Sequence, residues 1–291
     1  MNKLQLFMYL YMYELELWLN EHTQEVSAIS FQSDEANTDR PLKEYLRDVI
    51  LSKCSRITKL KSIINIEIVD SNKIVHHFFI DDKVKSAYIE FVYLPEEITS
   101  EIKDILKRRK SAVFTNPDLC IVINIDGKLE YETIELKSTK SDSIPGSSVQ
   151  QIAPNEWVIF VKHGKSEVEV ATGQYYHAIN SKMQFPDRSP RPQVSFSELQ
   201  NWNSLYRKKN ETAIAFYSIG DESVKCELLT DWQGVLAKRW SDIVFDKKVK
   251  KKEPWFNNNL RKFIIEFLNK YDSMNLKEQA EYKKHLKEIT K

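Results

Sequence analysis

The sequence has few cysteines, almost no excess charge of either sign, and no long hydrophobic run. Its three cysteines, Cys54, Cys120 and Cys226, are isolated and never form a Cys-x-x-Cys pair. This spacing argues against a disulfide framework and against a structural zinc site, and it favours a reducing, cytoplasmic setting. The formal net charge is +1 over 291 residues. Affinity for an acidic polymer would therefore have to come from local clusters of basic residues.

The apolar segment near the N-terminus, from Leu4 to Tyr13, is too short to cross a membrane. A bilayer span needs about 20 apolar residues, whereas Glu14 and Glu16 follow this segment directly. No small-residue cleavage site marks it as a signal peptide. We expect a buried or interface helix there.

Strand and helix signals alternate over most of the chain, and the last third is mainly helical. Pro41 lies in the first turn of a helix that continues to about Cys54. Strand-like runs follow at 63–69, 74–80 and 87–94. From Asp231 onward the pattern is helical. The sequence predicts an α/β domain over 1–194 and a mainly helical region over 195–291.

Two polar segments flank a predicted hairpin in the middle of the chain. Asn116-Pro117-Asp118 precedes the apolar run 119–125, and Asp126-Gly127 then predicts a tight turn. The returning strand ends in Glu135-Leu136-Lys137. Side chains repeat every second residue in a strand, so Glu135 and Lys137 share one face. The hairpin brings Asp118 to the same end of the sheet as this pair.

Two carboxylates and one amine at adjacent strand ends match the needs of a magnesium-dependent nuclease. Mg²⁺ prefers oxygen ligands and keeps several waters, so Asp118, Glu135 and a substrate phosphate can complete its shell. Lys137 would orient or help deprotonate the attacking water. Because charged residues make up 29% of the chain, a solvated strand end is the alternative interpretation of the bare motif. The strands and the polar segment that follow favour the catalytic interpretation.

The stretch 116–163 resembles the PD-(D/E)xK nuclease superfamily, and within it a type II restriction endonuclease. Pro117-Asp118 and Glu135-Leu136-Lys137 carry the resemblance, together with the order strand, catalytic strand, short polar helix, strand. It implies a mixed β-sheet core flanked by helices, and Mg²⁺-dependent, site-specific cleavage of double-stranded DNA that leaves 5′-phosphates. Mn²⁺ is expected to substitute for Mg²⁺. A prokaryotic cytoplasm, a homodimer and a companion DNA methyltransferase encoded nearby are also implied.

An acidic residue from an upstream helix often joins such a site, and Glu44 is the candidate here. An exposed glutamate on a helix surface is the more common interpretation of that position. Candidate DNA contacts are Thr139, Lys140, Ser147, Gln150, Gln151, Arg188 and Arg191. Glutamine can pair with adenine, and arginine with guanine or phosphate, although solvated surface positions use the same residues.

Three further patterns have a functional and a plain interpretation. The lysine-rich run 247–252 could clamp DNA phosphates, or it could be a solvated linker. The apolar stripe from Phe256 to Tyr271 predicts a core or dimer face. His76 and His77 are adjacent on a predicted strand, so they face opposite ways and cannot easily share a metal ion.

Two alternatives to a restriction enzyme remain open from the sequence. One is a structure-specific nuclease of DNA repair or recombination, which would use the same core. The other is a non-catalytic DNA-binding module with a nuclease-like fold. The presence of Asp118, Glu135 and Lys137 together argues against the second alternative.

Overall fold

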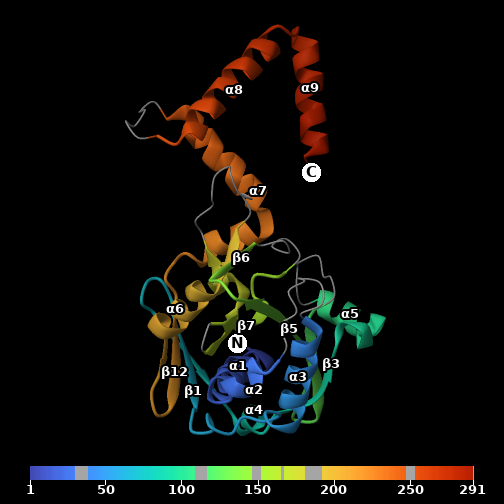
Figure 1. Cartoon of the computed structure of the whole chain (residues 1–291), viewed down its shortest axis with the longest axis vertical. Helices are drawn as coiled ribbons and strands as arrows, with labels where there is room; N and C mark the ends of the chain where they lie inside the picture. Colours follow the sequence, from blue (N-terminus) through green and yellow to red (C-terminus); the bar gives the residue numbers. More distant parts are fainter. Residues whose placement is uncertain are drawn as a thin grey trace. The chain divides into compact units, whose positions relative to one another are not determined.

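The computed structural model describes residues 1–29, 39–108, 117–145, 152–164, 167–180, 192–246 and 253–290 (Figure 1). These residues form a mixed α/β protein with mixed sheets. The chain divides into two compact units; among the described residues, the first extends to Trp232 and the second begins at Gln233. Within the described ranges, no helix is long and apolar enough to cross a membrane.

A five-stranded mixed sheet lies at the centre of the first unit. Its order is β3-β4-β5-β7-β8. These strands are β3 (Tyr88–Tyr93), β4 (Leu119–Ile125), β5 (Lys128–Thr139), β7 (Trp157–His163) and β8 (Val168–Gln174). Only β5 and β7 pair in parallel among these neighbours. At the β4–β5 turn Asp126 has φ 56° and Gly127 has φ 76°, as a primed hairpin turn requires. The predicted hairpin is therefore present.

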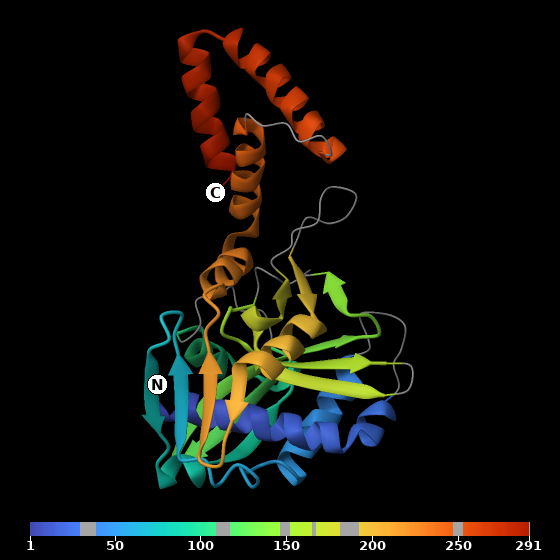
Figure 2. The same ribbon diagram turned by 90° about the vertical axis from the view of Figure 1, so that its left-hand side faces the viewer.

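Helices cover both faces of β4, which explains its continuous apolar sequence. Leu119, Ile121 and Ile123 belong to the core that α1 (Lys3–Glu21) and α3 (Asp39–Ser52) share with the sheet. Cys120 points to the other face and packs with Ile98, Ile102 and Leu106 around α5 (Ser100–Lys107). Helix α1, blue in Figure 2, has 19 residues, most of which are buried. The sequence predicted a buried or interface helix for the apolar N-terminal segment, and the structure places this helix in the core.

Two smaller sheets complete the first unit. One has the order β11-β12-β1-β2 and includes the parallel pair β1–β12. Its strands are β1 (Asn65–Val69), β2 (Val75–Phe79), β11 (Arg207–Lys209) and β12 (Ala213–Tyr217). The other has the order β6-β10-β9, with strands β6 (Ser143–Pro145), β9 (Ile179–Asn180) and β10 (Gln193–Ser195). The short helices of this unit are α2 (Thr23–Ser27), α4 (Asp82–Lys85), η1 (Pro95–Glu97) and η2 (Tyr175–Ala178). Helix α6 (Phe196–Tyr206) begins at the cap Ser195, whose side chain accepts from the Glu198 amide.

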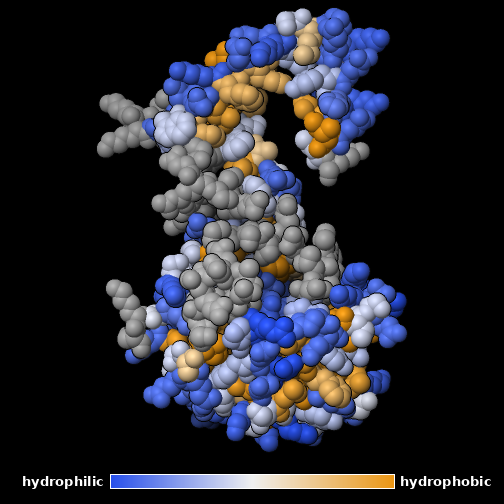
Figure 3. All heavy atoms as spheres, turned by 45° about the vertical axis from the view of Figure 1, so that its right-hand side comes forward, coloured by the Kyte–Doolittle hydropathy of each residue, from blue (hydrophilic) through white to orange (hydrophobic). Residues whose placement is uncertain are grey.

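The C-terminal part is mainly helical, but strands β11 and β12 also lie within the region 195–291. Its described helices are α6, whose bounds are given above, α7 (Glu222–Phe245), α8 (Trp255–Asp272) and α9 (Leu276–Ile289). Helix α7 has a non-helical residue, Asp231, at φ −147° and ψ 56°. In the second unit, Phe267, Tyr271 and Tyr282 bring α8 and α9 together. Apolar side chains reach the surface of this unit (Figure 3), and Phe245 is 80% and Phe263 61% exposed.

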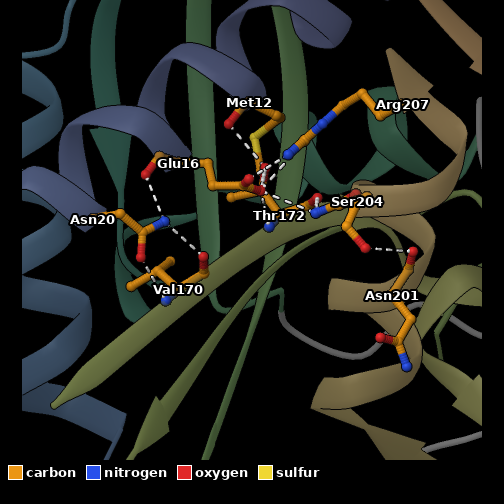
Figure 4. Close-up of polar contacts among 9 residues, drawn as sticks. Met12, Glu16, Asn20, Val170, Thr172, Asn201, Ser204 and Arg207 are labelled. Carbon is orange, nitrogen blue, oxygen red and sulfur yellow. Dashed lines mark hydrogen bonds and ion pairs between the residues drawn. The ribbon is translucent and has the colours of Figure 1, made fainter.

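Two buried glutamates fasten α1 to the rest of the first unit. Glu14 accepts hydrogen bonds from the backbone amides of Thr58, Lys59 and Leu60 at 2.8, 2.7 and 2.9 Å. Glu16 forms an ion pair with Arg207. It also accepts from the Thr172 amide at 2.6 Å (Figure 4) and from the Asn203 side chain at 3.1 Å. Glu14 and Glu16, which follow the apolar segment in the sequence, therefore bind its helix to the rest of the first unit.

Candidate active site

The pairing of β4 with β5 places Asp118 beside Glu135. Leu119 pairs with Ile134 in this antiparallel ladder, so the next residues along the two strands, Asp118 and Glu135, face each other across the hairpin. Ile134 and Leu136 point into the core shared with α1. Glu135 and Lys137 therefore point to the opposite face, as predicted from the alternation.

Asp118 is held by one backbone group and one lysine. Its Oδ2 accepts a hydrogen bond from the Leu136 amide at 2.8 Å. Its Oδ1 forms an ion pair with Lys43 Nζ of helix α3 at 2.7 Å. Both side chains are largely buried, with 14% of Asp118 and 16% of Lys43 exposed. The hydrogen bond from the Leu136 amide fixes the Asp118 carboxylate relative to β5.

Glu135 and Lys137 form a second ion pair on the same face. Lys137 Nζ lies 2.5 Å from Glu135 Oε1, and both side chains are largely buried. The ammonium group also lies 5.9 Å from the ring centre of Tyr175, where the negative face of the ring favours a cation. Lys137 is thus held over the sheet by a carboxylate and an aromatic ring.

Burial and neighbouring charges change the acidity of this second pair. Burial raises the pKa of Glu135 to about 7; Lys137 opposes this rise, whereas Asp118 and Glu156 add to it. For Lys137, burial is the largest single effect and lowers the pKa, but the charges of Glu135, Tyr175 and Asp118 and the hydrogen bond to Glu135 together outweigh it, and the net direction is upward. Lys137 therefore stays cationic at neutral pH, while Glu135 exchanges its proton in that range.

Two residues near the site have no signal in the sequence that links them to it. One is Lys43, which flanks the buried stripe of α3 and reaches Asp118 from a distant segment. The other is Glu156, which is buried just before β7 and accepts a hydrogen bond from the Thr133 hydroxyl. Thr133 precedes Glu135 by two residues on β5, so Glu156 lies beside the same face of the strand.

The predicted upstream glutamate has other partners. Glu44 forms an ion pair with Arg40 at 2.8 Å, and Arg40 also contacts Glu96 at 3.2 Å. These are surface side chains, which agrees with the plainer interpretation of Glu44. Helix α3 thus brings a lysine, not this glutamate, to Asp118.

Two of the candidate DNA contacts lie just after Lys137. Thr139 is buried at the end of β5, and its hydroxyl oxygen accepts from the Ser141 amide at 3.1 Å. Lys140 is exposed, and together with burial its charge lowers the pKa of His163. The remaining candidates and the lysine run lie outside the described residues: Ser147, Gln150, Gln151, Arg188, Arg191 and 247–252.

The two adjacent histidines on β2 have separate acidic partners. His76 lies 3.4 Å from Asp70, and His77 lies 3.4 Å from Glu67. Both histidines are exposed. Over the described ranges, no group of three histidine, cysteine or acidic side chains is arranged to hold a metal ion.

The donor set of Asp118 and Glu135 nevertheless fits a magnesium ion. A carboxylate offers about four lone-pair sites, and Asp118 uses two of them for the Leu136 amide and Lys43. Mg²⁺ typically takes one or two protein carboxylates and completes its shell with waters and substrate phosphate. Two hard oxygen ligands on one face are therefore enough.

No family model, curated protein or solved structure matches this chain.

Proposed function

We propose that the protein is a magnesium-dependent endonuclease of the type II restriction class, which cuts double-stranded DNA at specific sites and leaves 5′-phosphates. The observation that carries the proposal is the cluster of Asp118, Glu135 and Lys137 on one face of the β4–β5 hairpin. The five-stranded mixed sheet with helices on both faces supports a restriction-endonuclease-like core.

In this proposal each side chain has a distinct task. Asp118 and Glu135 hold the metal ion, and the Leu136 amide keeps Asp118 aligned with β5. A bound Mg²⁺ supplies charge stabilisation at the phosphoryl oxygens and makes a water more acidic. Lys137, cationic and fixed beside Tyr175, positions the water that attacks phosphorus and stabilises the charge that develops as the P–O3′ bond breaks. Burial of these groups strengthens each electrostatic contact.

The second unit supplies the proposed dimer interface. Trp255, Phe263 and Leu268 are 62%, 61% and 46% exposed on α8, and a groove between α7 and α8 is lined almost entirely by apolar side chains. Exposed apolar surface of this kind is typical of an interaction site. A symmetric homodimer would match a palindromic DNA site and cut one strand per subunit.

A cleavage assay tests the proposal directly. Purified protein is incubated with phage DNA and Mg²⁺, and the products are separated on a gel. Discrete bands are expected, and Asp118→Ala and Glu135→Ala should each abolish them. A smear would indicate a nonspecific nuclease, and cutting confined to junctions or nicks would favour a repair enzyme. Intact DNA, or full cutting by either variant, would overturn the proposal.

A further inference from the structure

Lys43 reaches the site from helix α3, outside the β4–β5 hairpin. It projects from α3, is 16% exposed, and places Nζ 2.7 Å from Asp118 Oδ1. The other oxygen of Asp118 is bound to the Leu136 amide, which is part of β5 and cannot leave without opening the strand. Lysine, by contrast, has a flexible four-carbon stem. The two partners of Asp118 therefore differ in how easily they can be replaced.

Two of the carboxylates in the cluster already have an ammonium partner without any added ion. Asp118 pairs with Lys43, and Glu135 pairs with Lys137. A divalent cation that approaches Asp118 must compete with an ammonium group already in hydrogen-bond contact with Oδ1. A DNA phosphate that enters at the same time brings negative charge, to which that ammonium group can transfer.

We propose that Lys43 couples metal binding to DNA binding at this site: it occupies Asp118 in the free protein, opposes metal binding there, and moves to a DNA phosphate when the metal and substrate bind together. This inference rests on the proposed function, because it takes the cation and the phosphodiester from it. By linkage, a group that makes metal binding depend on DNA must equally make DNA binding depend on metal.

The affinity of the DNA-free protein for Mn²⁺ tests the inference without relying on catalysis. An opposite charge within about 4–6 Å typically changes an ionic equilibrium about 10- to 1000-fold. Lys43→Met should therefore bind Mn²⁺ at least about tenfold more tightly than the wild type. Lys43→Gln, which keeps a polar side chain, should do the same. Lys43→Arg keeps the charge and should resemble the wild type. If Lys43 had only a structural role, these substitutions would not raise the affinity for Mn²⁺.

Arg40→Met is the matched control. Arg40 lies on the same helix and loses the same charge on mutation, but it pairs with Glu44 and Glu96. Its Mn²⁺ affinity should equal that of the wild type. Asp118→Asn should lose most Mn²⁺ binding, which shows that the ion measured is the one beside Lys43.

A second measurement follows DNA. Fragmented phage DNA is titrated with each variant at fixed ionic strength, with and without Ca²⁺. Calcium should increase the DNA affinity of the wild type. In Lys43→Met the factor of this increase should be about tenfold smaller, since the variant has no ammonium group to bind the phosphate. An equal gain in both proteins would refute the transfer of Lys43 to DNA.

The outcomes separate this inference from the proposed function. If the wild type binds Mn²⁺ through Asp118 and both Lys43→Met and Lys43→Gln bind it no more tightly, the inference fails and the nuclease proposal stands. If these variants bind Mn²⁺ more tightly but the wild type cuts no DNA, the inference holds and the nuclease proposal fails. If Mn²⁺ binds to none of the proteins, both are wrong.

Discussion

Two pairs of buried carboxylates in the first unit differ in the nature of their partners. Glu14 and Glu16 on α1 bind backbone amides and an arginine that are fixed by the fold. Asp118 and Glu135 each pair with a lysine. All four are removed from solvent to a similar degree. Burial of a charge is therefore common to both pairs of carboxylates. The pairs differ in that Asp118 and Glu135 each have a lysine partner, whose flexible side chain can be exchanged for another cation.

The fixed partners of Glu16 have a clear structural consequence. Arg207 stacks over the Tyr13 ring at 4.0 Å while it pairs with Glu16, and Thr172 on β8 donates two hydrogen bonds to the same carboxylate. These contacts join α1, β8 and β11. Loss of these partners would break contacts that join three elements of the fold, whereas the Lys43 and Lys137 ammonium groups contact carboxylate side chains.

Metal removal should have its largest effect on Asp118 and Glu135, the proposed metal ligands, and none on Glu14 and Glu16. We expect EDTA to abolish DNA cleavage and Mg²⁺ or Mn²⁺ to restore it. Ca²⁺ should support DNA binding without turnover, because its larger and looser shell misplaces the attacking water. The thermal midpoint of unfolding should change little in EDTA. Robust cleavage in EDTA would contradict the mechanism.

Substitution of Lys137 should have the next largest effect on the cleavage rate. Lys137→Ala removes the cation held beside Tyr175 and Glu135, and cleavage should slow by about 10²- to 10³-fold, which is typical for loss of one group that stabilises a transition state. DNA binding measured in Ca²⁺ should be nearly unchanged. Single-turnover kinetics provide the rate. A loss of less than about tenfold would place Lys137 outside direct contact with the reacting groups.

Glu16 should matter for stability instead of rate. Glu16→Ala leaves Arg207 buried without its carboxylate, and breaking a buried pair in this way typically costs about 3–5 kcal/mol. Urea unfolding of wild type and variant gives the difference in the free energy of unfolding. At a temperature where the variant is folded, its cleavage rate per folded molecule should match that of the wild type. A loss below about 1 kcal/mol would mean that the fold tolerates exchange of these partners as well.

The smallest expected effect is the pH dependence of stability that comes from His177. It is buried and stacked on Trp202, with ring centres 3.4 Å apart. Burial, with the charges of Lys225 and Arg207, holds its pKa well below the usual 6.5. The unfolded chain therefore takes up a proton below about pH 6.5 that the folded chain refuses. The wild type should lose up to about 1.4 kcal/mol of stability per pH unit from this group as pH falls below that value.

The comparison of wild type with His177→Asn isolates this pH effect. Urea unfolding at several pH values between neutrality and pH 5 gives both curves. The difference between them should grow in favour of the variant as pH falls, because asparagine does not titrate. Parallel curves would show that His177 accepts its proton without unfolding.

The hairpin was readable from the sequence because its signals are local. Asp126-Gly127 predicted the turn, and the alternation at Glu135 and Lys137 predicted their shared face. Burial of α1 was also predicted from its apolar run. Lys43 and Glu156 were not predicted as neighbours of the site, since their contacts join segments far apart in the chain and helix or strand periodicity carries no information about such contacts. The parallel pairing of β1 with β12 was missed for the same reason.

The glutamates of α1 illustrate a second limit. In the sequence, Glu14 and Glu16 are two acidic residues that directly follow an apolar segment. Their partners, the amides of Thr58, Lys59 and Leu60 and the side chain of Arg207, become adjacent only after folding. Acidic residues are rarely buried unless paired, so sequence patterns favour the surface for them. In the structure both glutamates are buried and paired.

The most direct test of the difference between the two pairs uses two isosteric variants, Asp118→Asn and Glu16→Gln. DNA cleavage with Mg²⁺ and the thermal midpoint of unfolding are measured for each variant beside the wild type. We predict that Asp118→Asn loses cleavage and keeps its thermal midpoint, whereas Glu16→Gln keeps cleavage per folded molecule and unfolds at a lower temperature. Full cleavage by Asp118→Asn, or loss of cleavage by a fully folded Glu16→Gln, would contradict the assignment of the two pairs.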